Sequence, residues 1–353
     1  MNKNKLWGIG MVVFCLLLLI VLGGMTAVID PFFHYHAPLE QLQYPLNNQR
    51  YQNDGIIQHF EYDAIITGTS MTENLRTSEM DALFGTNAIK TSFSGGTFTE
   101  LNRNLNKALQ ANPDIKMVLY GMDGWFLFEG KGQMRTDAVF PDYLYDDNLF
   151  NDVEYVLNKE IFFSDTLEVP IYTRQGNITT SFDDYSSWRW FTFSREETLK
   201  NYPRPERTGT IEPLTDELIG LITDNMHETV AMAKEYPDVT FVYFFPPYSA
   251  LYWDELERTG RLEYQMEAFR LATELLLQAD NIQLYSFLDD YEIVLDLDNY
   301  MDSCHHTGEV NSRVLEKIHA GEHRLTKDNY ESYWQELLAF YQGFDFDSLF
   351  PAE

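Results

Sequence analysis

The sequence predicts an α/β domain built on a parallel sheet and preceded by one hydrophobic helix. Three observations support this prediction. Short apolar runs alternate with stretches of helical period in residues 62–125, and the alternation resumes in residues 216–320. Polar or glycine-rich residues directly follow the apolar runs, and residues 6–29 contain no charged side chain. Strands and helices that alternate at this spacing are typical of a parallel sheet with right-handed crossovers.

Length and composition limit the classes of protein to which the chain can belong. Its 353 residues are 44% hydrophobic, so we expect one large domain, with or without an insertion. The formal net charge of −30 disfavours nucleic-acid binding, because an acidic surface repels phosphate groups. Two cysteines, Cys15 and Cys304, are too few for a disulfide framework or a cysteine-rich zinc module.

The N-terminal residues predict a membrane anchor. Residues 6–29 follow Lys3 and Lys5, and a helix of that length spans ~36 Å, enough for the core of a bilayer. The apolar run is longer than that of a cleaved signal peptide and lacks a convincing cleavage site. We therefore expect residues 1–30 to be an uncleaved signal anchor of a single-pass cell-membrane protein. The positive-inside rule places the remaining chain outside the cytoplasm.

The elements of the predicted domain follow in order. Residues 31–60 lack a clear period and predict a connecting segment, and residues 61–345 predict the α/β domain. Thr97 and Glu100 have the spacing of a capping box at the start of one helix. The expected strands cover residues 64–67, 88–93, 116–120, 239–245 and 282–287, and the expected helices cover 78–84, 97–111, 216–235, 262–279, 308–320 and 327–343.

The alternation stops between about residues 126 and 215, where Asp, Tyr, Phe and Trp are frequent. This stretch predicts an aromatic-rich insertion. We expect it to cover the edge of the sheet formed by the carboxyl ends of the strands, because open α/β sheets carry their sites at that edge.

A serine and a histidine–aspartate pair are the strongest candidates for chemistry. Ser70 follows the first expected strand, and Asp302 and His305 have a spacing that lets the carboxylate bind one ring nitrogen and leave the other free for a serine proton. Each feature also has a simpler interpretation: Ser70 can cap a helix, and Asp302 can belong to a solvated acidic loop. His306 is a rival base, but its spacing from Asp302 is less suitable.

Glycines follow the second strand, and a polar residue follows the third. Gly95 or Gly96 can offer a backbone N–H to an oxyanion, and Asp123 in the sequence Gly121-Met122-Asp123 can position the serine. Ordinary turn chemistry would explain the same residues. The polar groups lie, in chain order, at the ends of successive strands of one expected sheet.

These residues resemble the four sequence blocks of the SGNH/GDSL hydrolase superfamily, namely Gly68-Thr69-Ser70, Gly95 or Gly96, Gly121-Met122-Asp123 and Asp302-x-x-His305. More narrowly, Thr67-Gly-Thr-Ser-Met-Thr-Glu-Asn74 and Phe244-Phe-Pro-Pro-Tyr-Ser249 resemble its membrane-anchored extracytoplasmic branch. That branch includes the D-alanyl-lipoteichoic acid biosynthesis protein and the alginate O-acetylation proteins. The resemblance covers about residues 62–125 and 239–320 and implies a three-layer α/β/α flavodoxin-like fold.

By this resemblance Ser70 is the nucleophile, His305 the base and Asp302 the residue that orients it. The backbone N–H groups of Ser70 and of Gly95 or Gly96 would form the oxyanion hole. The family usually has Asn where this chain has Asp123. An ionised carboxylate only accepts hydrogen bonds, so Asp123 would have to be protonated, turned away or used for another purpose. The departure leaves acyl transfer or a degraded site open.

Several further side chains suit a substrate, although core packing explains them equally well. Aromatic rings bind the apolar faces of sugars, and arginine binds phosphate or carboxylate groups. Cys304 beside His305 is disfavoured as a second nucleophile, because adjacent side chains seldom face each other. The acidic loop residues do not match a calcium loop, so no metal site is expected. The candidate substrate-binding residues are Trp125, Trp188, Arg189, Trp190 and Tyr248.

Two functional hypotheses follow. The first is a membrane-tethered extracytoplasmic serine esterase or O-acyltransferase that acts on acyl esters of a cell-envelope glycopolymer through an acyl-serine intermediate, without cofactor or metal. The resemblance implies a membrane-bound O-acyltransferase as acyl donor partner, and an envelope polysaccharide or teichoic-acid-like polymer as acceptor. The alternative is a catalytically weak or inactive protein of the same fold that binds polymer or assembles a surface acylation complex.

Overall fold

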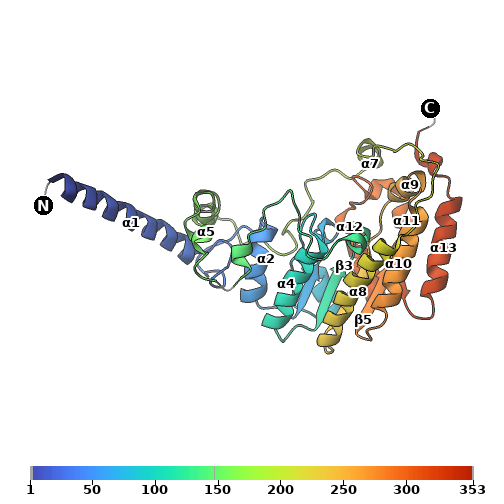
Figure 1. Cartoon of the computed structure of the whole chain (residues 1–353), viewed down its shortest axis with the longest axis horizontal. Helices are drawn as coiled ribbons and strands as arrows, with labels where there is room; N and C mark the ends of the chain where they lie inside the picture. The colour runs from blue at the N-terminus through green and yellow to red at the C-terminus, as the bar shows by residue number, and fades with distance from the viewer. Residues whose placement is uncertain (1–2, 147, 352–353) are drawn as a thin grey trace. The chain divides into compact units, whose positions relative to one another are not determined.

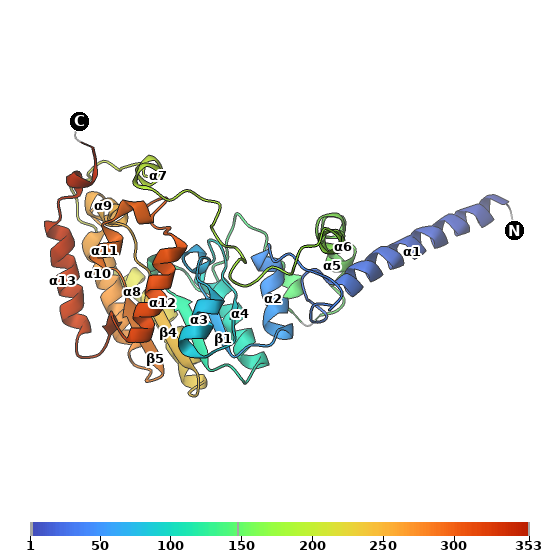
Figure 2. The same cartoon turned by 180° about the vertical axis from the view of Figure 1, so that it is seen from behind.

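The computed structural model describes residues 3–146 and 148–351 and divides the chain into two compact units. One, here called the N-terminal unit, contains Met1–Phe60 and Asp137–Ser181. The other, here called the α/β unit, contains Glu61–Thr136 and Phe182–Glu353. Figure 1 shows the elements of both, and Figure 2 shows them from behind. The stretch from 137 to 181 thus groups with the first sixty residues, whereas 182–215 belongs to the α/β unit.

The α/β unit is built on a six-stranded, mostly parallel sheet, as the alternating pattern predicts. Its strand order is β2-β1-β3-β4-β5-β6, and only β6 runs antiparallel to its neighbour. The chain moves to opposite sides of β1 when it forms β2 and β3, so the strand order reverses there, which is where open α/β sheets place their sites. The strands are β1 (Ala64–Thr67), β2 (Ala88–Lys90), β3 (Met117–Gly121), β4 (Thr240–Phe245), β5 (Ile282–Ser286) and β6 (Arg324–Leu325).

Helices cover both faces of this sheet. One face is covered by α4 (Phe98–Ala111), α8 (Asp216–Glu235), α10 (Leu262–Leu276) and α13 (Tyr330–Gly343), which lie in front of it in Figure 1. The other face is covered by α3 (Thr77–Phe84) and α12 (Gly308–Ala320), which lie in front in Figure 2. The remaining helices of this unit are α7 (Arg195–Lys200), α9 (Ala250–Arg258) and α11 (Tyr291–Val294), with short 3₁₀ turns η1 (Ser70–Thr72), η2 (Gly124–Phe128), η5 (Leu297–Asn299) and η6 (Phe346–Leu349).

The core of the α/β unit follows from the pleat of the strands. Alternate residues such as Ile66, Leu119 and Val242 point to the same face and pack with Val314 and Leu315 of α12. Burial of apolar surface contributes about 25 cal/mol per Å² to the free energy of folding, so this packing holds the strand ends in place. The carboxyl ends of β1, β2 and β3 therefore form a rigid base for the residues that follow them.

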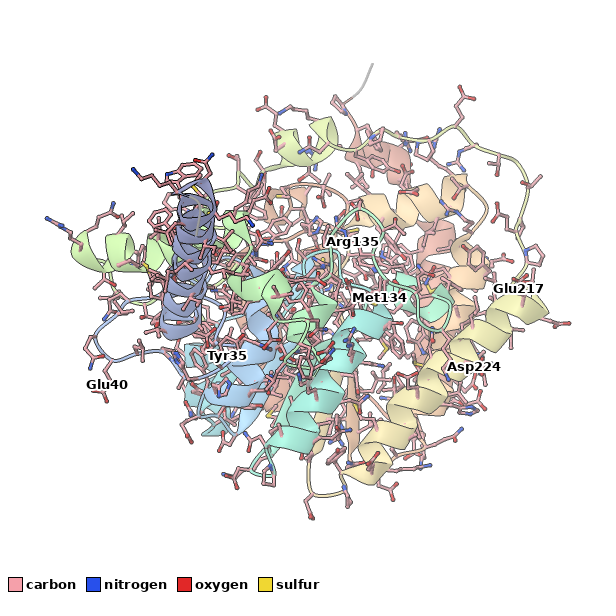
Figure 3. All side chains as sticks on the ribbon, turned by 60° about the vertical axis from the view of Figure 1, so that its left-hand side comes forward. Tyr35, Glu40, Met134, Arg135, Glu217 and Asp224 are labelled. Atoms are coloured by element: carbon pink, nitrogen blue, oxygen red, sulfur yellow. The ribbon has the colours of Figure 1, made fainter. Side chains whose placement is uncertain are left out.

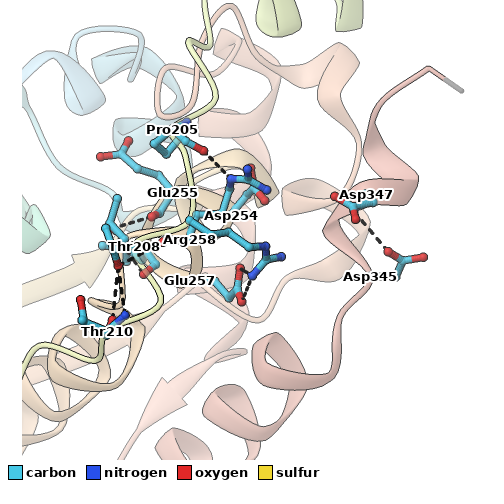
Figure 4. A network of polar contacts seen from close by, with 12 residues as sticks. Pro205, Thr208, Thr210, Asp254, Glu255, Glu257, Arg258, Asp345 and Asp347 are labelled. Carbon is cyan, nitrogen blue, oxygen red and sulfur yellow. Dashed lines mark hydrogen bonds and ion pairs between the residues drawn. The ribbon is translucent and has the colours of Figure 1, made fainter. Parts of the chain in front are cut away.

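An extended segment of the expected insertion is fixed along α9. The backbone N–H of Thr208 donates to the Arg258 carbonyl at 2.9 Å, and the Arg258 guanidinium donates to the Pro205 carbonyl (Figure 4). Arg204 forms two hydrogen bonds of 2.9 Å with the buried carboxylate of Asp254. Two-point pairing of this kind fixes geometry as well as charge, so residues 204–208 are anchored to the α/β unit rather than loose.

The N-terminal unit is helical and begins with the apolar helix. By length and composition α1 (Lys3–Ile29) can cross a membrane. Asp30 follows the last residue of α1, and its buried carboxylate accepts the backbone N–H groups of His34, Tyr35 and His36. Figure 3 labels Tyr35 in the turns that follow α1. The unit also contains α2 (Gln49–His59), η3 (Asp142–Leu144), α5 (Val153–Val156), the π-helix η4 (Ile161–Thr166) and α6 (Glu168–Arg174).

Candidate active site

Ser70 lies immediately beyond the carboxyl end of β1, at the start of η1. The turn that places it there requires glycine at position 68, where φ is +145° and a Cβ atom would lie 2.6 Å from the Thr72 methyl group. The hydroxyl of Thr69 caps the turn by accepting the backbone N–H of Met71 at 3.4 Å. The serine is thus held at the edge of the sheet by a short, sharply turned segment.

Ser70, His305 and Asp302 form a continuous hydrogen-bonded chain. The Ser70 Oγ atom lies 2.8 Å from His305 Nε2, although the two residues are 235 positions apart. On the other side of the ring, His305 Nδ1 lies 2.6 Å from Asp302 Oδ2. A proton on Nδ1 is donated to the carboxylate, which leaves Nε2 free to accept the serine hydroxyl. The structure therefore brings the three predicted residues together in the order that proton transfer requires.

Asp302 is itself fixed in place. Its Oδ1 atom accepts the backbone N–H groups of Cys304 at 2.8 Å and His305 at 2.7 Å. Burial alone would raise the pKa of this carboxyl, but the hydrogen bonds from the His305 ring and backbone outweigh it and hold the pKa below its usual value. The carboxylate remains ionised at mildly acidic pH and can stabilise a positive charge on the imidazole.

His306 and Cys304, the sequence neighbours of His305, are not placed to act as base or nucleophile. The ring of His306 is buried, and burial lowers its pKa to about 4; its Nδ1 lies 3.3 Å from the Thr307 carbonyl. Burial also raises the pKa of the Cys304 thiol, which disfavours the thiolate that a cysteine nucleophile needs. His305 is the histidine that lies against Ser70.

The two candidate oxyanion glycines differ in what they can donate. The Gly96 N–H already donates to the Phe93 carbonyl at 2.8 Å and closes a tight turn. Gly95 occupies the position of positive φ in that turn, at +53°. A Cβ atom there would lie 2.2 Å from Nη1 of Arg135, which donates to the Ser94 carbonyl. Figure 3 labels Arg135 in the loop that carries it. The cationic side chain of Arg135 therefore lies directly against Gly95.

Asp123 follows β3 and is completely buried. One carboxylate oxygen accepts the hydroxyl of Thr69, the neighbour of Ser70, and the other accepts the hydroxyl of Tyr248 at 2.6 Å. The Tyr248 oxygen in turn accepts the N–H of Gly124 at 3.1 Å. Desolvation raises the pKa of Asp123 to about 6, despite these two hydrogen bonds and the nearby His305. Its carboxylate therefore ties two neighbouring loops together through hydroxyl groups.

Trp188 packs directly on the histidine. Its indole ring is stacked on His305 with ring centroids 4.5 Å apart and an interplanar angle of 27°. The indole N–H donates to the buried carboxylate of Glu73, and the Trp188 backbone N–H donates to the Asn74 side chain at 2.7 Å. The Asn74 amide also donates to the His306 carbonyl at 3.1 Å. The residues after Ser70 thus hold both the histidine loop and the ring that covers it.

Sequence reasoning did not single out Glu73 and Asn74. Both belong to the stretch Thr67–Asn74 on which the family resemblance partly rests, and this is the only signal that pointed to them. Their function depends on the position of Trp188, which is more than a hundred positions away. No local pattern encodes that pairing.

The other candidate substrate residues lie beside Trp188 or Tyr248. Arg189 pairs with Asp184 at 2.5 Å, and its guanidinium lies over the ring of Trp190, which is 83% exposed. Trp125 is stacked beside buried Tyr248, with ring centroids 6.4 Å apart. A cleft of about 450 Å³ adjoins Trp188. Its lining includes Asn74, Arg76, Asp183, Trp188, Arg189 and Glu309.

The described residues contain no group of three His, Cys, Asp or Glu side chains that could hold a metal ion. No protein-family model matches the chain, and no curated protein matches it. A solved structure from Streptococcus pneumonia, provisionally described as a platelet activating factor, is similar over 77% of this chain and 91% of that one. The sequence identity is 10% and the TM-score is 0.39, a similarity too distant to assign a family.

Proposed function

We propose that the chain is a serine-dependent ester hydrolase or O-acyltransferase of the SGNH type, with a three-layer flavodoxin-like core. The chain of hydrogen bonds from Ser70 through His305 to Asp302 is the observation that carries the proposal. A serine hydroxyl is a weak nucleophile unless an adjacent base removes its proton. His305 Nε2 lies at the distance such a base needs.

In the first half of the reaction, the Ser70 Oγ atom attacks an acyl carbonyl carbon while His305 accepts the serine proton. The tetrahedral intermediate collapses, the bond to the leaving alkoxide breaks, and His305 returns the proton to that oxygen. In the second half, water or a substrate hydroxyl loses its proton to His305 and attacks the acyl-serine ester. Ser70 then regains the proton, so acid or new ester leaves and the site is restored.

The developing oxyanion needs donors of its own. The backbone N–H groups of Ser70 and Gly95 fill this role, because the Gly96 N–H is already used within its turn. Asp123 serves a different purpose: it positions Thr69, and through it the backbone of Ser70. Because an ionised Asp123 cannot donate the hydrogen bond that the family's Asn usually gives the oxyanion, the main reaction can be acyl transfer to a well-placed hydroxyl group.

The substrate that fits these features is an acyl ester of an extracytoplasmic glycopolymer. The apolar helix α1 would tether the enzyme to the membrane, with the α/β unit outside. The cleft beside Trp188 is not lined by Ser70 or His305. Its Arg76 and Arg189 suit the phosphate groups of a teichoic-acid-like chain, and its Asp183 and Glu309 suit the hydroxyl groups of a polysaccharide. A membrane-bound O-acyltransferase would supply the acyl group if transfer rather than hydrolysis dominates.

One observation favours a second candidate function. Asp123 stands where the family usually has the Asn that donates to the oxyanion, and its two oxygens accept the hydroxyl groups of Thr69 and Tyr248 instead. A protein that keeps the fold but has lost efficient chemistry would bind polymer or assemble a surface acylation complex.

The test uses the full chain in detergent or nanodiscs, with p-nitrophenyl acetate as substrate and a fluorophosphonate probe. We expect the probe to modify Ser70, located by peptide mass spectrometry, and Ser70→Ala to abolish both labelling and turnover. Ser332→Ala, an exposed serine on α13, is the matched control and should retain both. Full turnover by Ser70→Ala, or labelling of another residue, would refute the proposal. Polymer binding without turnover in the native chain would support the second candidate.

A further inference from the structure

Exposed apolar side chains are concentrated in one part of the chain. Outside α1, eight of the thirteen exposed large apolar residues lie within the 45 residues 137–181, and five lie in all the rest of the described chain. Phe150 is 93% exposed and Phe163 is 69% exposed. Contiguous exposed apolar surface on a soluble protein usually marks an interaction site. Five of these residues flank or belong to α5 and η4: Leu149, Phe150, Val153, Leu157 and Phe163. We call them the apolar collar.

The collar adjoins the end of α1 within the N-terminal unit. Gly23 of α1 is buried, and a Cβ atom there would lie 3.1 Å from the Leu157 side chain. Thr26 is also buried, and its hydroxyl accepts that of Thr166 in η4 at 3.2 Å. The helix and the collar are therefore packed together where α1 enters the folded part of the unit.

The length of α1 decides how deep this junction lies in a membrane. The uncharged residues that precede Gly23, Leu6–Leu22, span only ~26 Å as a helix. The hydrocarbon core of a bilayer is ~30 Å thick. The core must therefore extend past Gly23, and Met25 and Val28 are indeed exposed on α1 beyond it. Residues packed against Gly23 then lie at the boundary between acyl chains and headgroups.

We infer that the apolar collar lies in the outer boundary of the bilayer that α1 crosses. Its exposed side chains would contact lipid, and the N-terminal unit would rest on the membrane instead of hanging from a flexible tether. The occupant is lipid rather than protein, because the collar continues the lipid-facing surface of α1. The inference rests on α1 spanning the membrane but does not depend on the chemistry proposed for Ser70.

The charge of this segment defines the kind of lipid contact. Residues 137–181 contain nine acidic and two basic side chains. Such a segment has no cluster of lysine or arginine that would select anionic lipids. Apolar burial alone drives the contact, so phosphatidylcholine should suffice and added salt should not release it.

The experiment measures lipid contact residue by residue in the full chain. Phe150→Cys and Phe163→Cys, each in a Cys15→Ala background, are labelled with an environment-sensitive fluorophore and reconstituted in phosphatidylcholine nanodiscs. Cys304 is only partly buried, so it is also replaced by alanine in every labelled variant. Circular dichroism spectra that match the native chain confirm folding. Leu17→Cys, within α1, reports whether the helix is inserted, and Ile211→Cys, which is 69% exposed in the α/β unit, is the matched aqueous control.

We expect a lipid that carries a nitroxide near its headgroup to quench the labels at 150 and 163. A lipid that carries the nitroxide deep in an acyl chain should quench the label at 17, because residue 17 lies near the centre of the bilayer. Iodide in the buffer should quench the labels at 150 and 163 roughly threefold less than the label at 211, because insertion by several ångströms excludes the ion. Iodide quenching at 150 and 163 equal to that at 211, with lipid quenching intact at 17, would refute the inference while α1 remains inserted. Loss of lipid quenching of the label at 17 would show that α1 is not inserted in the bilayer, and the inference would then lose its premise. Labels at 150 and 163 shielded from both quenchers in the nanodiscs would show that protein covers the collar, which also contradicts the inference.

Discussion

The indole of Trp188 is stacked on the imidazole of His305, with 4.5 Å between ring centroids and 27° between the ring planes. His305 is therefore held on three sides: by Ser70 at Nε2, by Asp302 at Nδ1 and by an aromatic ring over its face. An aromatic face stabilises a cation by about 0.5–2 kcal/mol. In the proposed reaction that cation is the imidazolium, which exists only after the serine proton has been transferred.

Replacement of Trp188 tests this stacking. We expect Trp188→Leu to lower kcat by roughly tenfold with little change in KM, because about 1.4 kcal/mol of stabilisation is lost in the transition state and not in substrate binding. Trp188→Phe keeps a ring over the histidine and should recover most of kcat. The measurement is steady-state hydrolysis of p-nitrophenyl acetate. If Phe were as harmful as Leu, the hydrogen bond to Glu73 would matter more than the stacking.

Asp302 offers a second test, because its role is to select a tautomer. Asp302→Asn keeps the shape of the side chain but can donate to His305 Nδ1, which would move the ring proton to Nε2 and block the serine. We expect kcat to fall by roughly a thousandfold to ten-thousandfold, with thermal stability nearly unchanged. Asp298→Asn, in the same loop, is the comparison and should keep kcat. A loss of less than tenfold in Asp302→Asn would show that the carboxylate does not orient the base.

The sheet and its helices are largely predictable from the sequence, because each depends on local periodicity. The apolar run at β1 and the capping box of Thr97 and Glu100 are signals contained within a few residues, and the structure has both. The two-residue strand β6 was not predicted, since a pair of residues has no period to detect. The sequence also did not predict that residues 137–181 group with the N-terminal unit, because this grouping depends on packing between distant segments.

Some residues of the candidate site could likewise be predicted from the sequence, and others could not. Ser70, Asp302 and His305 carry recognisable chemistry at recognisable places, so the sequence could nominate them. Trp188 could be named only as one aromatic among many, because its stacking on the histidine depends on contacts with Glu73 and Asn74. The engagement of Asp123 by two hydroxyl groups was equally hidden, since both partners lie on other loops.

The buried carboxyl of Asp123 predicts a pH-dependent stability. Its pKa is raised from 3.8 to about 6, so the folded state binds a proton that the unfolded chain releases. This proton stabilises the fold below pH 3.8, and the stabilisation is lost as the pH rises through about 6. Asp123→Asn does not titrate. Its free energy of unfolding relative to that of the native chain should therefore rise by on the order of 2 kcal/mol between pH 4.5 and 7.5, and its relative Tm should rise with it.

The comparison is made by thermal unfolding in one detergent at both pH values. Asp328→Asn, an exposed aspartate, should follow the native chain at both. If the difference between Asp123→Asn and the native chain did not change with pH, the carboxyl would keep one protonation state from pH 4.5 to 7.5, and its pKa would not lie near 6.

Gly95 tests the proposed oxyanion hole. Gly95→Ala introduces a side chain where φ is +53°, a conformation that costs an L-residue roughly 1–2 kcal/mol, and it forces the Arg135 guanidinium away from its present place. Because the Gly95 N–H would shift from the oxyanion, we expect kcat to fall by roughly a hundredfold. The double variant Gly95→Ala/Arg135→Ala removes the collision but keeps the strained backbone. If Arg135→Ala alone loses as much kcat as Gly95→Ala, displacement of the arginine explains the loss. If Arg135→Ala keeps kcat and the double variant is as slow as Gly95→Ala, the loss belongs to the backbone N–H, as the proposed mechanism requires.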